Sequence, residues 1–216
     1  MSLKSFWKRR FNKQNEEDPL VPLLFGEQGE NNEAMFFPEV AEARKNGAED
    51  VVKQLLLEKT ESEESRLQIL AWSELRNLSV IPDESIAKKV LGFVIEVGMN
   101  KGVDYLAVYS DNAARYYNFS GAKIIYQCDE KSINEKIQKL LYYCEGTVKH
   151  IGLWEGARRS PPEENMCRIN FLTPAGLFFG EGPMRALEQD PLSKDIIVQA
   201  TTVMKSLIAL YGKTRK

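Results

Sequence analysis

The sequence predicts an α+β fold in which an N-terminal helical hairpin precedes an antiparallel sheet of about five to seven strands with helices on one face. Apolar residues recur at helical spacing in 39–79, 132–145 and 190–212. Short β-branched and aromatic runs alternate with turn residues in 90–127, which is typical of an antiparallel meander. Runs of strands broken by single helices indicate helices packed on such a sheet.

The chain of 216 residues divides into three parts. We expect 1–37 to be a flexible segment, 38–82 to be the helical hairpin, and 83–216 to be the α+β domain. The first segment changes from basic to acidic: 1–13 contain five bases and no acid, whereas 14–64 contain fourteen acids and four bases. An apolar cluster at 20–25 predicts that this part docks on the protein body or on a partner.

The hairpin is predicted from two apolar stripes. The first helix begins near Glu39, and Gly47 interrupts it. Thr60 and Glu63 have the spacing of a capping box and predict the start of the second helix. Pro82 lies beyond its end, because proline cannot continue a helix.

The predicted α+β domain begins with four strands, VLGFVIEVGM, DYLAVY, ARYYNF and KIIYQ. Ser132 and Glu135 form a second capping box for the next helix. A hairpin made of CRINFLT and LFFGEG follows, and a last helix is predicted from Asp190 to Gly212. Seven apolar residues are predicted to be mostly buried: Leu106, Tyr116, Ile125, Leu140, Phe171, Val203 and Leu207.

Composition argues against several classes of protein. A net charge of −2 does not fit a wholly basic nucleic-acid binder. No run reaches the roughly 18 apolar residues that a membrane-spanning helix needs, and no apolar segment follows the basic start as in a secretory signal. Cys128, Cys144 and Cys167 match no metal or redox spacing. We therefore expect free thiols and a cytoplasmic location.

The first candidate site lies in the predicted meander, where polar residues are densest. Strand alternation places Arg115 within reach of Asp104 or Asp111 on the preceding strand and turn. We favour a structural cross-strand ion pair. The alternative is an anion pocket in which Arg115 is a fork-shaped donor.

The second candidate site comprises Trp154, Glu155, Arg158 and Arg159, just before a proline-rich loop. Two adjacent arginines and an aromatic ring can clamp an acidic or phosphate-bearing partner. A solvated loop with one ion pair explains the same residues, and the sequence leaves both alternatives open.

The sequence predicts no catalytic residue, metal site or cofactor. His150 is the only histidine, so a histidine-based site lacks a second ligand or a partner of the same kind. The chain contains neither the GxSxG turn of a serine hydrolase nor a GxxxxGK phosphate loop.

Three stretches carry a resemblance: ESRLQILAWSELRNLSVIP, VLGFVIEVGMNKGVDYLAVYSDNAARYYNFSG and RINFLTPAGLFFGEGPMRALEQDPL. Over roughly residues 40–210 the chain is similar to a family of uncharacterised bacterial proteins. The most distinctive pieces are Ala-Arg-Tyr before Ser-Gly, and Phe-Leu-Thr-Pro-x-Gly before Phe-Gly-x-Gly-Pro. The resemblance implies a bacterial, cytoplasmic protein and implies no catalytic residues.

These observations predict a non-enzymatic binding or scaffold protein with a protein partner, such as an accessory subunit of a bacterial assembly. The first alternative is an enzyme or sensor that acts on an anionic or phosphorylated small molecule through one of the two candidate sites. The second is a peripheral membrane or nucleic-acid binder. Its contacts would be Lys4, Lys8, Arg9, Arg10 and Lys13.

Overall fold

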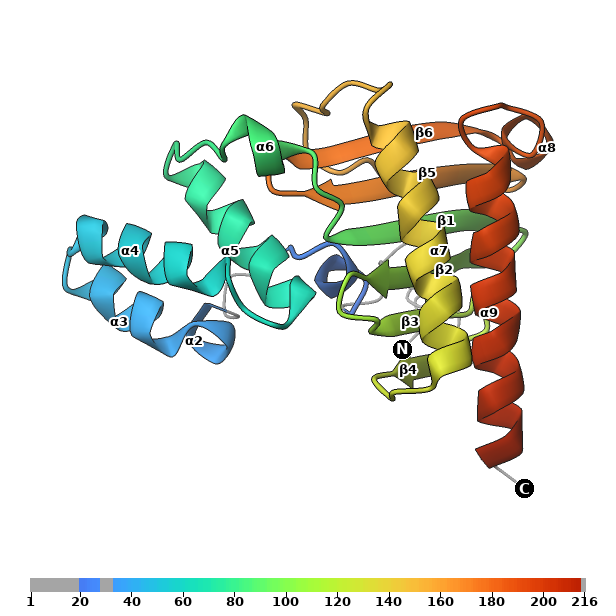
Figure 1. Cartoon of the computed structure of the whole chain (residues 1–216), viewed down its shortest axis with the longest axis horizontal. Coiled ribbons are helices and arrows are strands. Elements are labelled where there is room, and N and C mark those ends of the chain that lie inside the picture. The colour runs from blue at the N-terminus through green and yellow to red at the C-terminus, as the bar shows by residue number, and fades with distance from the viewer. Residues whose placement is uncertain (1–19, 28–32, 215–216) are drawn as a thin grey trace, which may run out of the picture.

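A six-stranded antiparallel sheet organises the chain in a computed structural model that describes residues 20–27 and 33–214. The strand order is β4-β3-β2-β1-β5-β6 (Figure 1). The strands are β1 (Gly92–Met99), β2 (Gly102–Tyr109), β3 (Ala114–Tyr117), β4 (Lys123–Tyr126), β5 (Met166–Thr173) and β6 (Gly176–Pro183). The predicted α+β fold with a sheet of five to seven strands is confirmed. The basic residues of 1–13 lie outside the described residues.

Helices lie before, between and after the strands. The described segments begin with η1 (Pro22–Leu24) and α2 (Glu33–Phe36). The longer helices are α3 (Pro38–Lys45), α4 (Glu49–Lys59), α5 (Ser65–Asn77), α7 (Lys131–Val148) and α9 (Lys194–Thr214). Two single turns, α6 (Glu84–Ala87) and α8 (Met184–Leu187), precede β1 and follow β6. The predicted hairpin thus contains three helices, and Gly47, with a φ of 69°, separates the first two.

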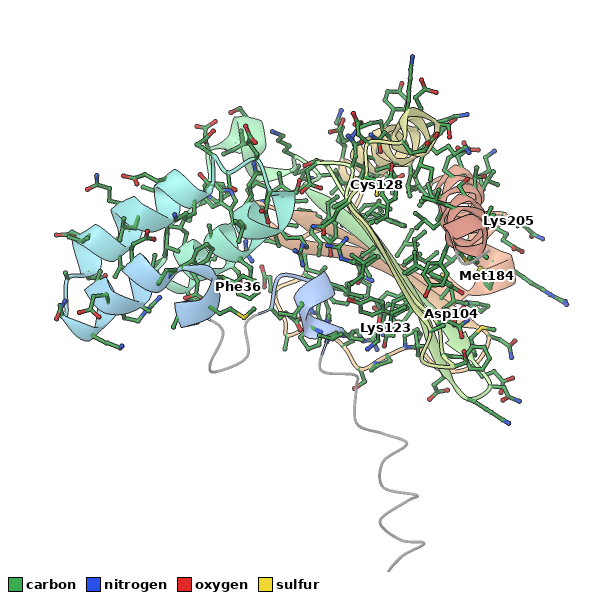
Figure 2. All side chains as sticks on the ribbon, turned by 90° about the horizontal axis from the view of Figure 1, so that it is seen from below. Phe36, Asp104, Lys123, Cys128, Met184 and Lys205 are labelled. Atoms are coloured by element: carbon green, nitrogen blue, oxygen red, sulfur yellow. The ribbon has the colours of Figure 1, made fainter. Side chains whose placement is uncertain are left out.

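One face of the sheet, the α7/α9 face, is covered by the two longest helices (Figures 1 and 2). Leu140 of α7 and Leu207 of α9 are fully buried against Phe93 and Phe171, whose rings lie 6.0 Å apart. Six of the seven predicted core residues are buried. The prediction for Ile125 is wrong, since 62% of it is exposed. Ile125 lies opposite Arg115 on the edge strand β4, and therefore points to the other face.

The other face, the α5 face, is covered in part by α5 and η1, so helices pack on both faces rather than on one. Ile69 and Leu75 of α5 are buried in the same cluster as Val94 of β1. The Tyr109 hydroxyl donates a hydrogen bond to the Leu24 carbonyl (2.9 Å). The apolar cluster at 20–25 therefore docks on the protein body, which is one of the two outcomes expected from the sequence. Helices α2 to α4 extend away from the sheet (Figure 1).

Helix starts differ from the predicted capping boxes. The first residue of α5 is Ser65, and its N–H donates to the Asp111 carboxylate (3.0 Å) from the β2–β3 turn. Helix α7 begins at Lys131, so Ser132 lies inside its first turn. Helix α9 begins at Lys194, because Asp190 accepts the Leu192 N–H (2.9 Å) within a preceding turn. For α5, a contact distant in sequence therefore supplies a cap that local spacing does not reveal.

Candidate functional site

A pocket of about 380 Å³ lies on the α5 face, between α5 and the β5–β6 hairpin. Four segments form its walls: α5, residues 25–27 after η1, the β5–β6 turn, and the loop at 154–158. Its floor is apolar, with Ile69 from α5, Leu172 from β5 and Leu177 from β6. Trp154, Glu155 and Arg158 of the second predicted site all line this pocket.

Helix α5 contributes the main polar group of the pocket. Ile69, Ser73 and Arg76 are spaced by four and three residues, so they share one face of α5. The Arg76 guanidinium donates through Nη1 to the Pro174 carbonyl (2.9 Å) in the β5–β6 turn. Burial lowers the pKa of Arg76. In 20–27 and 33–214, no carboxylate forms an ion pair with it.

Arg158 contacts Glu27 and Phe25 of the segment after η1. Its Nε donates to the Glu27 carboxylate (2.8 Å), and its guanidinium lies over the Phe25 ring, 4.4 Å from the ring centre. These contacts join the loop at 154–158 to the segment after η1. Arg158 thus forms an ion pair at the pocket wall, as the second alternative expected, but its side chain is 10% exposed rather than solvated.

Trp154 shapes the loop around the pocket. Its backbone N–H donates to the Leu177 carbonyl (2.8 Å), and its indole N–H donates to the Ala157 carbonyl (2.9 Å). A Cβ at Gly156 would lie 2.8 Å from the indole ring, so only glycine fits this close turn. The indole remains 40% exposed. Glu155 is exposed in the same turn.

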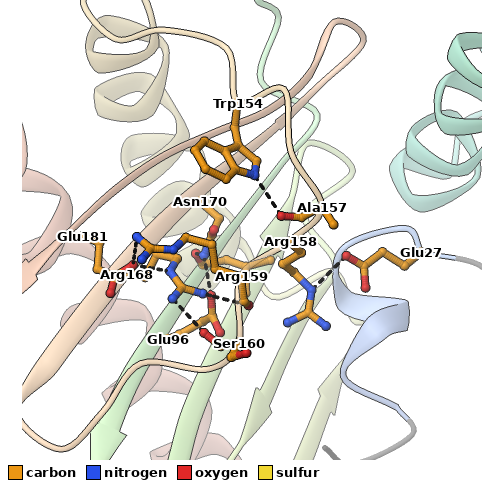
Figure 3. A network of polar contacts seen from close by, with 11 residues as sticks. Glu27, Glu96, Trp154, Ala157, Arg158, Arg159, Ser160, Arg168, Asn170 and Glu181 are labelled. Atoms are coloured by element: carbon orange, nitrogen blue, oxygen red, sulfur yellow. Dashed lines mark hydrogen bonds and ion pairs between the residues drawn. The ribbon is translucent and has the colours of Figure 1, made fainter.

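A ladder of charged residues, two of them buried, lies beneath the loop at 159–163 (Figure 3). Glu96, Arg168 and Glu181 occupy matching positions on β1, β5 and β6. Arg168 donates to Glu96 (3.2 Å) and to Glu181 (2.9 Å). The side chains of Arg168 and Glu96 are 3% and 0% exposed. Asn170 adds a bond to Glu96 (3.0 Å).

Arg168 also binds the loop at 159–163 to the sheet. Arg168 donates to the carbonyls of Arg159 (3.2 Å) and Ser160 (2.8 Å), and the Arg159 side chain pairs with Glu181 (3.2 Å). Gly98 of β1 is part of this contact, because the Glu163 carbonyl occupies the space where a Cβ would lie. Arg159 is therefore a structural partner of Glu181 in this structure.

The first predicted site is not assembled as expected. Asp104 accepts hydrogen bonds from the Tyr116 hydroxyl (2.8 Å) and the Phe119 N–H (2.8 Å), and Asp111 caps α5. Arg115 is buried and donates to the carbonyls of Ala114 (2.8 Å) and Tyr126 (3.0 Å). The expected cross-strand ion pair is absent from the described contacts. Strand alternation places Arg115 on the α5 face and Asp104 on the opposite one.

Sequence reasoning missed Arg76 and the ladder. Glu96 and Arg168 each interrupt an apolar strand, in FVIEVG and CRINF, and a charge in that setting signals a buried pair. Arg76 gives no such signal, because a basic residue in the last turn of a helix is ordinary. No cluster suited to a metal ion, and no helix that could span a membrane, occurs in the part of the chain that the structure describes.

Comparison with protein-family models, with curated proteins and with solved structures returns no match for this chain. The resemblance to a bacterial family therefore stays an expectation from the sequence.

Proposed function

We propose that the protein binds a small anionic ligand in the pocket, with Arg76 as the main contact. The observation that carries this proposal is the half-buried Arg76 guanidinium, which lines the pocket and, within residues 20–27 and 33–214, hydrogen-bonds to one backbone carbonyl and to no carboxylate. A guanidinium has five N–H donors, and its forked edge matches a carboxylate or a phosphate. A cation that has lost part of its hydration is stabilised by an anion at that edge.

Neighbouring residues suit a binding role. Ser73 and Asn77 of α5 line the pocket beside Arg76 and carry neutral hydrogen-bonding groups. The apolar floor can take the non-polar part of a ligand. A concave site that combines apolar side chains with convergent polar groups suits small-molecule binding.

Two features that favoured a scaffold protein have internal roles. Helix α9 packs its apolar face on the sheet, and the cluster at 20–25 docks on the α5 face. The pocket brings Arg158 and Glu155 together, which favours the small-molecule alternative. We therefore rank ligand binding, as in a sensor, above a scaffold role.

The test replaces Arg76 by glutamine and measures binding by calorimetry. The probes are 4-methylpentanoate, 3-phenylpropionate and inorganic phosphate, titrated into the full chain. Loss of a hydrogen bond to a charged group costs about 1.5–3 kcal/mol, so the variant should bind an anionic probe about 10- to 100-fold more weakly.

Arg66→Gln is the matched control, because Arg66 is a half-buried residue of the same helix outside the pocket lining. Arg66→Gln should keep the wild-type affinity. Equal affinities of wild type and Arg76→Gln for every probe would contradict the proposal.

A further inference from the structure

The charges that line the pocket balance. Four charged side chains lie in its walls: Arg76, Arg158, Glu27 and Glu155. Arg158 and Glu27 neutralise each other at 2.8 Å. One cation, Arg76, and one anion, Glu155, remain without an ion-pair partner in the described part of the chain. The pocket therefore offers one site of each sign.

We infer that the ligand is a zwitterion, namely an α-amino acid whose carboxylate meets Arg76 and whose ammonium group meets Glu155. This inference rests on the proposed function, since it needs an anionic group at Arg76. It adds a second contact of opposite sign and thereby names the ligand class.

Other anions fit this charge pattern less well. A phosphate ester carries close to two negative charges at neutral pH, and the pocket side chains sum to zero. A simple carboxylate would satisfy Arg76 but would leave the Glu155 carboxylate of the pocket without a counter-ion. An ammonium group on the same ligand supplies that counter-ion.

The pocket also selects the side chain of the amino acid. Ile69, Leu172, Leu177 and Trp154 line the same pocket as the two charged residues. The volume of about 380 Å³ is at the lower end for small-molecule sites. An apolar side chain such as that of leucine or phenylalanine suits these walls.

The experiment compares ligands that differ by one charge. L-phenylalanine, 3-phenylpropionate and L-phenylalaninamide share a ring; the second lacks the ammonium group and the third lacks the carboxylate. L-leucine, 4-methylpentanoate and L-leucinamide form a second set. Calorimetry with the full chain should give tighter binding for at least one amino acid than for both of its analogues.

Two variants assign the contacts. Glu155→Gln should weaken amino-acid binding about two- to fivefold, the range of an exposed ion pair, and should leave binding of the deaminated acid unweakened. Arg76→Gln should weaken both the amino acid and the deaminated acid. Glu164→Gln is the matched control, because Glu164 is an exposed glutamate outside the pocket lining, and it should change nothing.

The outcomes separate this inference from the proposed function. If a deaminated acid binds as tightly as its amino acid, depends on Arg76 and ignores Glu155→Gln, the inference is wrong and the proposed function stands. If neither amino acid raises the melting midpoint at millimolar concentration while a deaminated acid does, the result is the same. If no probe binds in an Arg76-dependent way, both are wrong.

Discussion

The two faces of the sheet are built differently. On the α7/α9 face, apolar side chains from β1, β5, α7 and α9 form one continuous cluster. On the α5 face, the apolar cluster under α5 gives way to Glu96, Arg168, Asn170 and Glu181, and a loop rather than a helix lies above them.

The difference follows from the hydrogen-bond partners that a covering helix and a covering loop require from the sheet. A helix satisfies its own backbone groups, so apolar side chains are sufficient beneath it. A loop brings unpaired carbonyls to the sheet, and burying them without donors is costly. Arg168 supplies donors to the carbonyls of Arg159 and Ser160, while Glu96 and Glu181 compensate its charge. The polar ladder therefore makes a loop-covered face possible, and the pocket lies between α5 and the preceding loop residues 154–158.

The largest expected effect concerns this ladder. Arg168→Leu leaves Glu96 buried without its main cation, which should lower the free energy of unfolding by about 3–5 kcal/mol in denaturant melts. The double variant Glu96→Leu/Arg168→Leu removes both buried charges and should lose less stability than Arg168→Leu alone. If the double variant instead loses as much stability as Glu96→Leu and Arg168→Leu added together, the ladder is not a coupled unit.

The apolar face should respond to cavities instead. Leu207 of α9 is fully buried, and Leu207→Ala should lower the free energy of unfolding by about 2–5 kcal/mol. The neighbouring Ile208 is 44% exposed, so Ile208→Ala should stay within about 0.5 kcal/mol of wild type. Similar losses for both variants would mean that α9 does not pack by this face.

A smaller loss of stability is expected from a substitution in β3, at Arg115. Arg115→Ala removes a donor from the carbonyls of two buried residues, Ala114 and Tyr126, and should cost about 1–3 kcal/mol. Arg115 and Asp104 share no partner in the described part of the chain. Thermal melts of Arg115→Ala, Asp104→Ala and the double variant should therefore give a coupling within about 0.5 kcal/mol of zero. A coupling of several kcal/mol would restore the cross-strand pair expected from the sequence.

Local patterns explain what the sequence could predict. Period-two runs such as CRINFLT and the stripe of the last helix are properties of neighbouring residues, so the strands and helices on the α7/α9 face follow from them. The predicted ion pair of Arg115 with Asp104 is wrong for a reason that the sequence does not show. Alternation tells which residues of one strand share a face, but the register between β2 and β3 decides which residues of β2 lie on the same face as Arg115.

The sequence alone predicted only part of the candidate site. Trp154, Glu155 and Arg158 are adjacent in sequence and could be grouped from their types. Arg76 reaches the same pocket from a helix almost eighty residues earlier in the chain, and only the packing of α5 on the sheet brings it there. Pairings across such separations have no local signal.

The reactivity of the three cysteines tests the two faces separately and involves the smallest change in stability. Cys144 and Cys167 are buried on the α7/α9 face, whereas Cys128 is exposed. Burial, with a contribution from the nearby Glu96 carboxylate, raises the pKa of Cys167 to about 12, and burial also raises the pKa of Cys144.

Since the thiolate is the reactive form, a disulfide reagent near pH 8 should label one thiol quickly in the folded protein and all three only in denaturant. Cys128→Ser should remove the fast reaction. Cys167 is the chain neighbour of Arg168, but the two side chains lie on opposite faces of β5. In Arg168→Leu under native conditions, Cys167 should therefore stay protected while backbone amides of the loop at 154–163 exchange faster with solvent. Rapid labelling of Cys167 in that variant would show that the faces open together, and that the ladder supports the whole sheet rather than the loop above it.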